Sequence, residues 1–327
     1  MDGAGPDDTA AEPGEGTVSW RQLLAEAERR LRAAAADPTS AGHRSVDPAT
    51  TALDARRIVE RSSGLEGAEW VLGLDRPATR RGVHFFDLMV ERRLTGEPLQ
   101  YVLGQWGFRT LDLMVDRRVL IPRPETEVVV DAALAELDRL TPGAEAERRR
   151  PTVVDLGTGS GAIGLSIAVE RPGTVVWATD ASPGALAVAR ANLAGLGGAG
   201  TSVRLAEGDW FAALPPELRG SVDLLVSNPP YVADGDPLPP IVEEWEPVQA
   251  LRAGPDGLDD LATIVLDGVA WLSEHGAVVV ELDPRQVPAV EVLAREAGFT
   301  SMSVVADLAG RHRAVVARRS PGSLPGA

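Results

Sequence analysis

The segment Val153-Val154-Asp155-Leu156-Gly157-Thr158-Gly159-Ser160-Gly161 decides the fold. An apolar run of strand character ends at Leu156, three glycines alternate with other residues, and a segment of helical character then runs to about Glu170. This order predicts a nucleotide-binding βα turn, because glycines permit a tight turn and a close approach of backbone to a ligand. The pattern D-x-G-x-G-x-G differs from the dinucleotide pattern G-x-G-x-x-G. We interpret these loop residues as cofactor-binding: Gly157, Thr158, Gly159, Ser160 and Gly161.

Two further predicted strands end in polar or aromatic residues. The strand at 175–179 ends in Asp180, whose carboxylate can accept both hydroxyls of a ribose. The strand at 202–206 leads to Asp209 and Trp210. Asp209 can accept a hydrogen bond from an adenine amine and Trp210 can pack along the ring, although Trp210 as a core aromatic under the sheet is the alternative.

The tetrapeptide Asn228-Pro229-Pro230-Tyr231 follows the apolar run 222–227. The prolines fix two φ angles, remove two N–H donors and favour an extended Asn228, which predicts a stiff loop at a strand end. Such a loop offers an amide oxygen, backbone carbonyls and an aromatic ring, which suits the binding of a planar NH2 group. We predict that Asn228, Pro229, Pro230 and Tyr231 are catalytic and that Asn228 also borders the cofactor. The alternative is a strand followed by a proline-rich turn.

Together these motifs resemble the HemK/PrmC family, whose members use S-adenosylmethionine to methylate the glutamine side-chain amide in the GGQ motif of peptide-chain release factors. The resemblance extends over roughly residues 94–318. It also rests on Gly96-Glu97-Pro98, Ile121-Pro122-Arg123-Pro124, Glu246-Pro247 and Gly254-Pro255-Asp256-Gly257-Leu258. It implies S-adenosyl-L-methionine as cofactor and a release factor, bound through its GGQ loop, as protein partner. It also implies a class I methyltransferase of the α/β class: a doubly wound, mostly parallel sheet, a small helical N-terminal domain and a β-hairpin connector.

Two positions depart from the family pattern. Glu243 and Glu244 stand shortly before Glu246-Pro247, where the family usually has an arginine. Asp283-Pro284 follows the predicted strand at 277–281, where the family commonly has a glycine.

We predict five regions along the chain. Residues 1–18 form an acidic, disordered tail, because they combine five carboxylates with many Gly, Pro and Ala and contain no Lys or Arg. Helical spacing of apolar residues predicts a substrate-binding domain at 19–97. A β-hairpin connector with its turn near Asp116-Arg117 is expected at 98–124, the methyltransferase domain at 125–319, and a frayed tail at 320–327.

Composition narrows the class of protein. The net charge of −16 disfavours direct nucleic-acid binding, which depends on neutralising phosphates. The sequence has no cysteine and its four histidines are scattered, so we expect no metal site. It contains neither a long apolar run nor the features of a signal peptide, so we expect a cytoplasmic protein without a membrane segment.

Two alternatives to a release factor methyltransferase remain open at this point. An adenine N6 DNA methyltransferase would hold a conjugated amine in the same Asn228 pocket. A non-catalytic S-adenosylmethionine-binding scaffold is the second alternative, against which the intact Asn228 and glycine loop argue.

Overall fold

The computed structural model describes residues 17–36, 46–140 and 150–320. The chain divides into two compact units. The first comprises the N-terminal part up to Gly104 together with Pro239–Trp245, and the second comprises Gln105–Leu238 and Glu246 onward. No described helix is long and apolar enough to cross a membrane. The predicted tails fall mainly outside the described residues, as does a polar hinge that the sequence predicts at 141–150.

The first unit is helical. Its helices are α1 (Trp20–Ala36), α2 (Thr51–Ser63), α3 (Gly67–Gly73), α4 (Arg80–Leu94), α5 (Leu99–Leu103) and α9 (Pro240–Trp245). Apolar side chains at helical spacing, such as Leu23, Ala27 and Leu31, form one core with Phe86 and Val90. The predicted helical character of this region is confirmed.

Two ion pairs with buried carboxylates lie at the turn between α4 and α5. Glu97 is 6% exposed and accepts hydrogen bonds from the Arg92 guanidinium, which also binds the Tyr101 carbonyl at 2.8 Å. Arg93 donates from Nε to Asp54 at 2.7 Å, and both side chains are buried. The Gly96-Glu97-Pro98 motif therefore maintains the fold of this unit through Glu97.

The second unit begins with a hairpin that is shorter than predicted. Strands β1 (Gln105–Phe108) and β2 (Leu111–Met114) pair around a turn at Arg109-Thr110, with Arg109 at φ +51°. The prediction of a hairpin starting at residue 98 was wrong, and the turn that does form at Asp116, where Val119 N–H donates to the Asp116 carbonyl at 3.0 Å, is not the hairpin turn. Helix α5 occupies the start because Leu99 and Val102 pack into the helical core and left-handed Gly104 ends the helix. The limits of the predicted domains remain a prediction.

A seven-stranded sheet forms the centre of the second unit, in the order β5-β4-β3-β6-β7-β9-β8. Its strands are β3 (Thr152–Leu156), β4 (Val175–Asp180), β5 (Val203–Glu207), β6 (Val222–Ser227), β7 (Leu272–Glu281), β8 (Ser301–Ala306) and β9 (His312–Arg318). Strands β3 to β7 pair in parallel, whereas β9 is antiparallel to both β7 and β8. The predicted mostly parallel sheet is confirmed.

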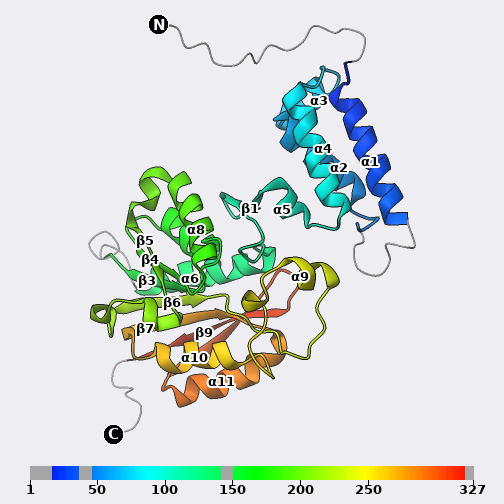
Figure 1. The fold of residues 1–327 in the computed structure, drawn as a ribbon. Helices are drawn as coiled ribbons and strands as arrows, with labels where there is room; N and C mark the ends of the chain where they lie inside the picture. The colour runs from blue at the N-terminus through cyan, green and yellow to red at the C-terminus, as the bar shows by residue number, and fades with distance from the viewer. Residues whose placement is uncertain (1–16, 37–45, 141–149, 321–327) are drawn as a thin grey trace, which may run out of the picture. The chain divides into compact units, whose positions relative to one another are not determined.

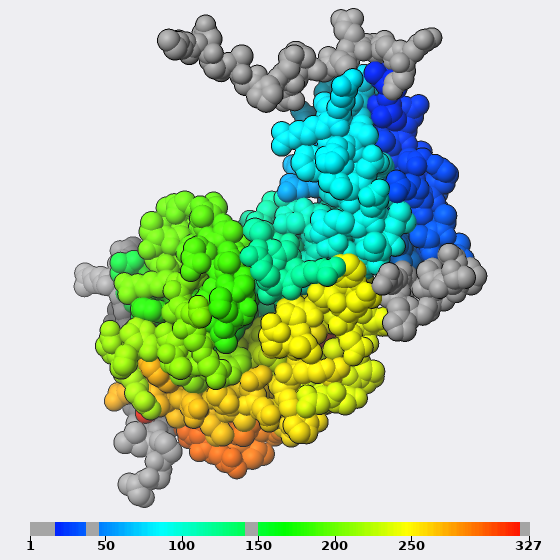
Figure 2. Space-filling model, viewed as in Figure 1, coloured from blue at the N-terminus to red at the C-terminus, as the bar shows by residue number. Residues whose placement is uncertain are grey.

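Helices cover both faces of this sheet (Figure 1). They are α6 (Glu127–Leu140), α7 (Ala162–Glu170), α8 (Pro183–Gly195), α10 (Asp259–Gly268) and α11 (Val287–Glu296). Alternate strand residues enter two separate cores: Val153 and Val279 pack with α6 and α7, while Val154 and Val278 pack with α10 and α11. Strand β9 is almost entirely covered in the space-filling view (Figure 2), which agrees with its buried centre.

The strand order brings the two main motifs together. The chain proceeds from β3 outward to β5, then returns to the other side of β3 with β6. Ligands of such sheets bind at this reversal, outside the carboxyl ends of the two strands. The glycine loop follows β3 and Asn228 follows β6, so both lie at the reversal.

Candidate active site

The glycine loop requires glycine for backbone geometry. Gly157, Gly159 and Gly161 have φ of +69°, +56° and +89°, a region that L side chains rarely adopt. A Cβ built on Gly159 would have no described atom within 4 Å, so the loop is open on that side. Gly161 is the N-cap of α7. Backbone N–H groups at this helix start are suited to an electronegative ligand.

Asp155 anchors the loop from below. Its side chain is 1% exposed, and Oδ2 accepts hydrogen bonds from Thr158 Oγ1 at 2.5 Å and from the Gly164 N–H at 2.9 Å. Burial raises the pKa of this carboxyl to about 7, against the lowering effect of the two hydrogen bonds. Its Oδ1 atom is buried and has no hydrogen-bond partner among the described residues. An unused acceptor thus lies directly under the loop.

Asp180 connects the loop to the end of β4. One carboxylate oxygen accepts from the Gly159 N–H at 2.9 Å, and the other accepts from the Ser182 N–H at 2.8 Å. Burial raises the pKa of Asp180, and the two backbone hydrogen bonds act in the opposite direction. Each oxygen retains a lone pair, so the carboxylate can still bind the hydroxyls of a ribose.

Trp210 lies beside the glycine loop with an unusual backbone, at φ +43°. Atoms of its indole ring are 3.5 and 3.7 Å from where a Cβ on Gly157 would be. Burial raises the pKa of the neighbouring Asp260, and the Trp210 indole opposes this rise. Trp210 is half-buried and also packs against a core cluster, so it combines the two predicted arrangements. Sequence reasoning missed Asp260, whose only signal was its place in an Asp-Asp pair starting a helix.

A cavity of about 500 Å³ joins these residues to the loop after β6. This volume is typical of a site for a small molecule. Its cofactor half is lined by Gly157, Thr158, Gly159, Ser160, Asp180, Ser182, Asp209, Trp210 and Asp260. Its acceptor half is lined by Pro122, Thr126, Asn228, Pro230, Pro247, Gln249 and Ala250. Gly161, Pro229 and Tyr231, predicted as site residues, are not among the residues that line the cavity.

Asn228 is oriented by a residue from a distant segment. Its Nδ2 donates to the Thr126 hydroxyl at 3.2 Å, in the 3-10 turn η2 (Pro124–Thr126) that precedes α6. Because the donor end of the amide is used in this way, the acceptor Oδ1 remains for a ligand.

Tyr231 supports the loop instead of lining the cavity. Its hydroxyl donates to Glu281 Oε1 at 3.2 Å, and its carbonyl accepts from Gln286 Nε2 at 2.9 Å. Burial and the neighbouring Glu281 raise the pKa of Tyr231, so the hydroxyl stays protonated. That Tyr231 covers a substrate amide stays a prediction.

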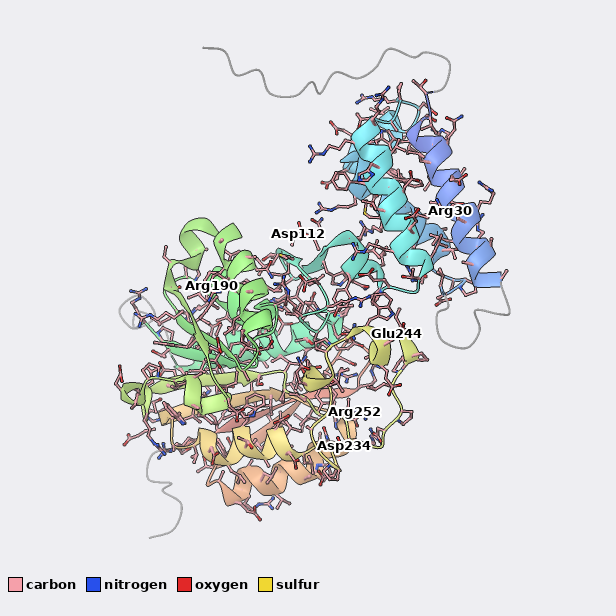
Figure 3. All side chains as sticks on the ribbon, viewed as in Figure 1. Arg30, Asp112, Arg190, Asp234, Glu244 and Arg252 are labelled. Carbon is pink, nitrogen blue, oxygen red and sulfur yellow. The ribbon has the colours of Figure 1, made fainter. Side chains whose placement is uncertain are left out.

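A second segment runs alongside the loop and holds its backbone. Val232 donates to the Leu251 carbonyl at 2.9 Å, and Ala253 donates back to the Val232 carbonyl at 3.0 Å. Arg252, which lies next to Asp234 in Figure 3, binds that residue's carbonyl at 2.8 Å. Gly257 has φ +73°, and a Cβ there would clash with the Tyr231 carbonyl oxygen. The Gly254–Leu258 motif is therefore part of the scaffold of the loop.

Two further buried side chains join distant segments. Glu246 accepts from the Ile121 N–H at 3.1 Å and from the Arg123 guanidinium, which links the Glu246-Pro247 and Ile121–Pro124 motifs. Asn192 binds both backbone groups of Met114, at 2.7 and 3.1 Å, and the Ser160 carbonyl at 2.8 Å. It thereby attaches the hairpin to the glycine loop, a role that nothing in its local sequence indicated.

The two segments that depart from the family pattern lie in different units of the structure. Asp283 caps the turn η8 (Pro284–Gln286). Its side chain accepts from the Arg285 N–H at 2.9 Å, and its own N–H donates to Gln286 Oε1 at 3.1 Å. Asp283-Pro284 therefore positions Gln286, which binds the Tyr231 carbonyl. Glu243 and Glu244 lie in α9, within the first compact unit.

Comparison with known families matches both parts of the chain. Residues 22–104 match the PrmC N-terminal domain, and residues 139–245 match the methyltransferase small domain. A release factor glutamine methyltransferase from Xylella fastidiosa (strain 9a5c) is 43% identical, over 75% of this chain and 84% of the relative. Relatives of the same name from Cereibacter sphaeroides and Deinococcus radiodurans are 40% and 38% identical, over 88% and 93% of this chain and 96% and 100% of their own.

The chain belongs to the release factor glutamine methyltransferase family. It is an S-adenosylmethionine-dependent enzyme with the class I methyltransferase fold, as its sequence predicted. A solved methyltransferase from Pyrococcus furiosus is 16% identical, with a TM-score of 0.46 over 65% of this chain and 90% of that chain. The comparisons favour this family over an adenine DNA methyltransferase or a non-catalytic scaffold.

The residues of the cofactor half fit S-adenosylmethionine. Gly159 leaves room beside the loop, and Asp180 has acceptor capacity for ribose hydroxyls. Asp209 and Trp210 line the same half of the cavity and would be the residues that hold the adenine. The individual roles of these residues remain proposals.

Proposed function

We propose that the protein transfers a methyl group from S-adenosylmethionine to the side-chain amide nitrogen of the GGQ glutamine in peptide-chain release factors. The observation that carries this proposal is Asn228, held by Thr126 so that its acceptor oxygen is left for a substrate N–H group. The identity of about 40% with relatives named release factor glutamine methyltransferase supports the choice of substrate.

The chemical difficulty is the substrate nitrogen. A primary amide is a poor nucleophile, because resonance delocalises its lone pair into the carbonyl. When bound, S-adenosylmethionine supplies a strongly electrophilic methyl group on its sulfonium centre. Asn228 Oδ1 and the Pro229 carbonyl would accept the two N–H bonds, which orients the nitrogen and increases its electron density. Neither atom is a strong base, so the proton leaves during or after transfer.

The protein partner would also be bound through residues that do not line the cavity. The helical unit exposes large apolar side chains, among them Val71, Leu72 and Phe85, which are suited to contacts with another protein. Such remote binding energy would position the glutamine, so a short GGQ peptide should be a poorer substrate than a folded release factor. A partner in translation places the enzyme in the cytoplasm.

Labelled methyl transfer to three acceptors tests the substrate. They are an intact release factor, the same factor with its GGQ glutamine replaced, and duplex DNA. We expect label on the first alone, located by mass spectrometry on the glutamine side chain. Equal label on the first two, or label on DNA, would reject the assignment.

A further inference from the structure

Behind Asn228 lies a buried carboxylate that the proposed reaction does not use. Glu281, at the end of β7, is 1% exposed. It accepts from the Tyr231 hydroxyl at 3.2 Å, and its pKa is lowered by the neighbouring hydroxyl of Thr126, the residue that accepts from Asn228. Its Oε2 atom is buried and has no hydrogen-bond partner among the described residues.

We propose that Glu281 and Thr126 form a relay that sets the orientation of the Asn228 amide. The two ends of an asparagine amide have nearly the same shape, so packing alone does not distinguish oxygen from nitrogen. In the structure Asn228 Nδ2 donates to the Thr126 oxygen, so the Thr126 hydroxyl hydrogen is left to donate to Glu281, whose buried Oε2 has no other partner among the described residues. An ionised Glu281 only accepts, so it fixes this direction and leaves Asn228 Oδ1 for the substrate.

Protonation of Glu281 would remove the constraint. A carboxylic acid can donate its own proton to the Thr126 oxygen, and the Thr126 hydroxyl can then donate to Asn228 Oδ1 after the amide has turned by half a rotation. The turned amide would offer N–H groups to the N–H groups of the substrate. This arrangement opposes binding in the productive orientation.

The surroundings of Glu281 put this change within an accessible pH range. Burial raises the pKa of Glu281 to about 7, and the negative charge of Glu125 adds to this effect. The hydroxyl groups of Thr126 and Tyr231 and the positive charge of Arg313 act in the opposite direction. Arg123 is a further cation near Tyr231. The productive, ionised form is therefore expected to increase as the pH rises through about 7.

The relay rests on the proposed function for its consequence, but its geometry can be measured separately. Asn192 and Asn228 are the only asparagines in the sequence, so selective labelling of asparagine side-chain nitrogen gives two pairs of amide signals in NMR spectra. We expect the Asn228 pair to shift with a midpoint near pH 7, and this midpoint to be absent in Glu281→Gln. Asn192, bound beside the glycine loop, controls for Asp155, whose pKa is also about 7.

Single-turnover kinetics test the effect on the reaction. Glu281→Gln and Thr126→Val should each lower the rate of methyl transfer at pH 8 on the order of ten- to a hundredfold, the cost of a misoriented group. S-adenosylmethionine affinity should stay within about twofold, and the double variant should be no slower than Thr126→Val, because the two residues act as a unit. Thr126→Ser keeps the hydroxyl and should retain most of the activity.

Thermal unfolding shows whether the glutamine variant is folded. The folded-state pKa of Glu281 lies above its ordinary value of 4.5, so ionisation of this group costs stability as the pH rises through 7. Glu281→Gln should therefore be more stable than wild type at pH 8 and lose this advantage below about pH 4.5.

The failure of each idea is distinguishable. If wild-type protein does not methylate a release factor, the proposed function fails, while the Asn228 signals still report on the relay. If wild type is active but the Asn228 signals do not titrate, or Glu281→Gln keeps its rate at pH 8, the relay is overturned alone.

Discussion

The two halves of the cavity are built in different ways. In the cofactor half, the carboxylates bind the glycine loop over short distances in the sequence: Asp155 and Thr158 are 3 positions apart, and Gly159 and Asp180 are 21 apart. In the acceptor half, Asn228 binds a residue 102 positions away, and Glu246 binds one 125 positions away. The first half is a local turn, whereas the second depends on side chains from several separate segments. We therefore expect the halves to respond differently to substitution.

The largest effect should come from Asn228→Ala, in the acceptor half. Removing the oxygen that orients the substrate nitrogen should lower the rate of methyl transfer by at least about a hundredfold, as for the loss of one transition-state hydrogen bond. The affinity for S-adenosylmethionine, measured by calorimetry, should change much less. Near-normal turnover in this variant would contradict the proposed mechanism.

Asp180→Ala should show the opposite pattern. Loss of a charged acceptor for the ribose should weaken S-adenosylmethionine binding by about 1.5–3 kcal/mol. The rate at saturating cofactor should stay closer to wild type than in Asn228→Ala. Asp180→Asn keeps one acceptor oxygen, so its S-adenosylmethionine affinity, measured by calorimetry, should lie between those of wild type and Asp180→Ala. An unchanged affinity in Asp180→Ala would remove this residue from the ribose role.

Gly257→Ala tests the scaffold of the acceptor half. The substitution forces a Cβ into a left-handed backbone and against the Tyr231 carbonyl, and should cost about 1–3 kcal/mol of unfolding free energy. Gly310→Ala is a matched control, because Gly310 has a similar φ of +77° but no described atom within 4 Å of its Cβ position. Denaturant unfolding should show losses in both variants, while methyl transfer should fall in Gly257→Ala alone. Equal activities would exclude a role of Gly257 in placing the loop.

Ser182→Ala should have the smallest effect. Ser182 caps α8, where its hydroxyl accepts from the Ala185 N–H at 3.2 Å, and loss of such a cap costs about 1 kcal/mol. Its N–H still binds Asp180, so cofactor affinity should fall less than in Asp180→Ala. Thr79→Ala removes the equivalent cap of α4 and should change stability without changing affinity. A loss of affinity in Ser182→Ala as large as in Asp180→Ala would show that the cap itself sets the ribose site.

The same difference explains what the sequence could predict. The glycine loop and Asp180 follow directly from strand, turn and glycine signals within 25 residues. Asn228 could be predicted as a site residue because the prolines that make its loop stiff follow it directly in the sequence. Thr126, Glu281 and Gln286 carry no local signal, because each acts through a partner that only the folded chain brings near.

The hairpin shows the limit of local turn signals. Asp116 does form a turn, in which its carbonyl accepts from the Val119 N–H at 3.0 Å. Strand pairing nevertheless ends at Met114, and the hairpin turn lies at Arg109. Arg109 has an unfavourable φ for its residue type, and its side chain is held by Glu170 at 2.6 and 2.7 Å and by Asp131 at 2.7 Å. The ion pairs of Arg109 with residues distant in the sequence thus stabilise the hairpin turn at Arg109.

The hold of Gln286 on the Tyr231 carbonyl has a consequence for the order of events during synthesis. A ribosome completes the glycine loop, Asp180 and Trp210 well before it reaches Glu281 and Gln286. A nascent chain of that length lacks the residues that fix the Asn228 loop. Catalytic competence is therefore acquired only in the last stretch of translation.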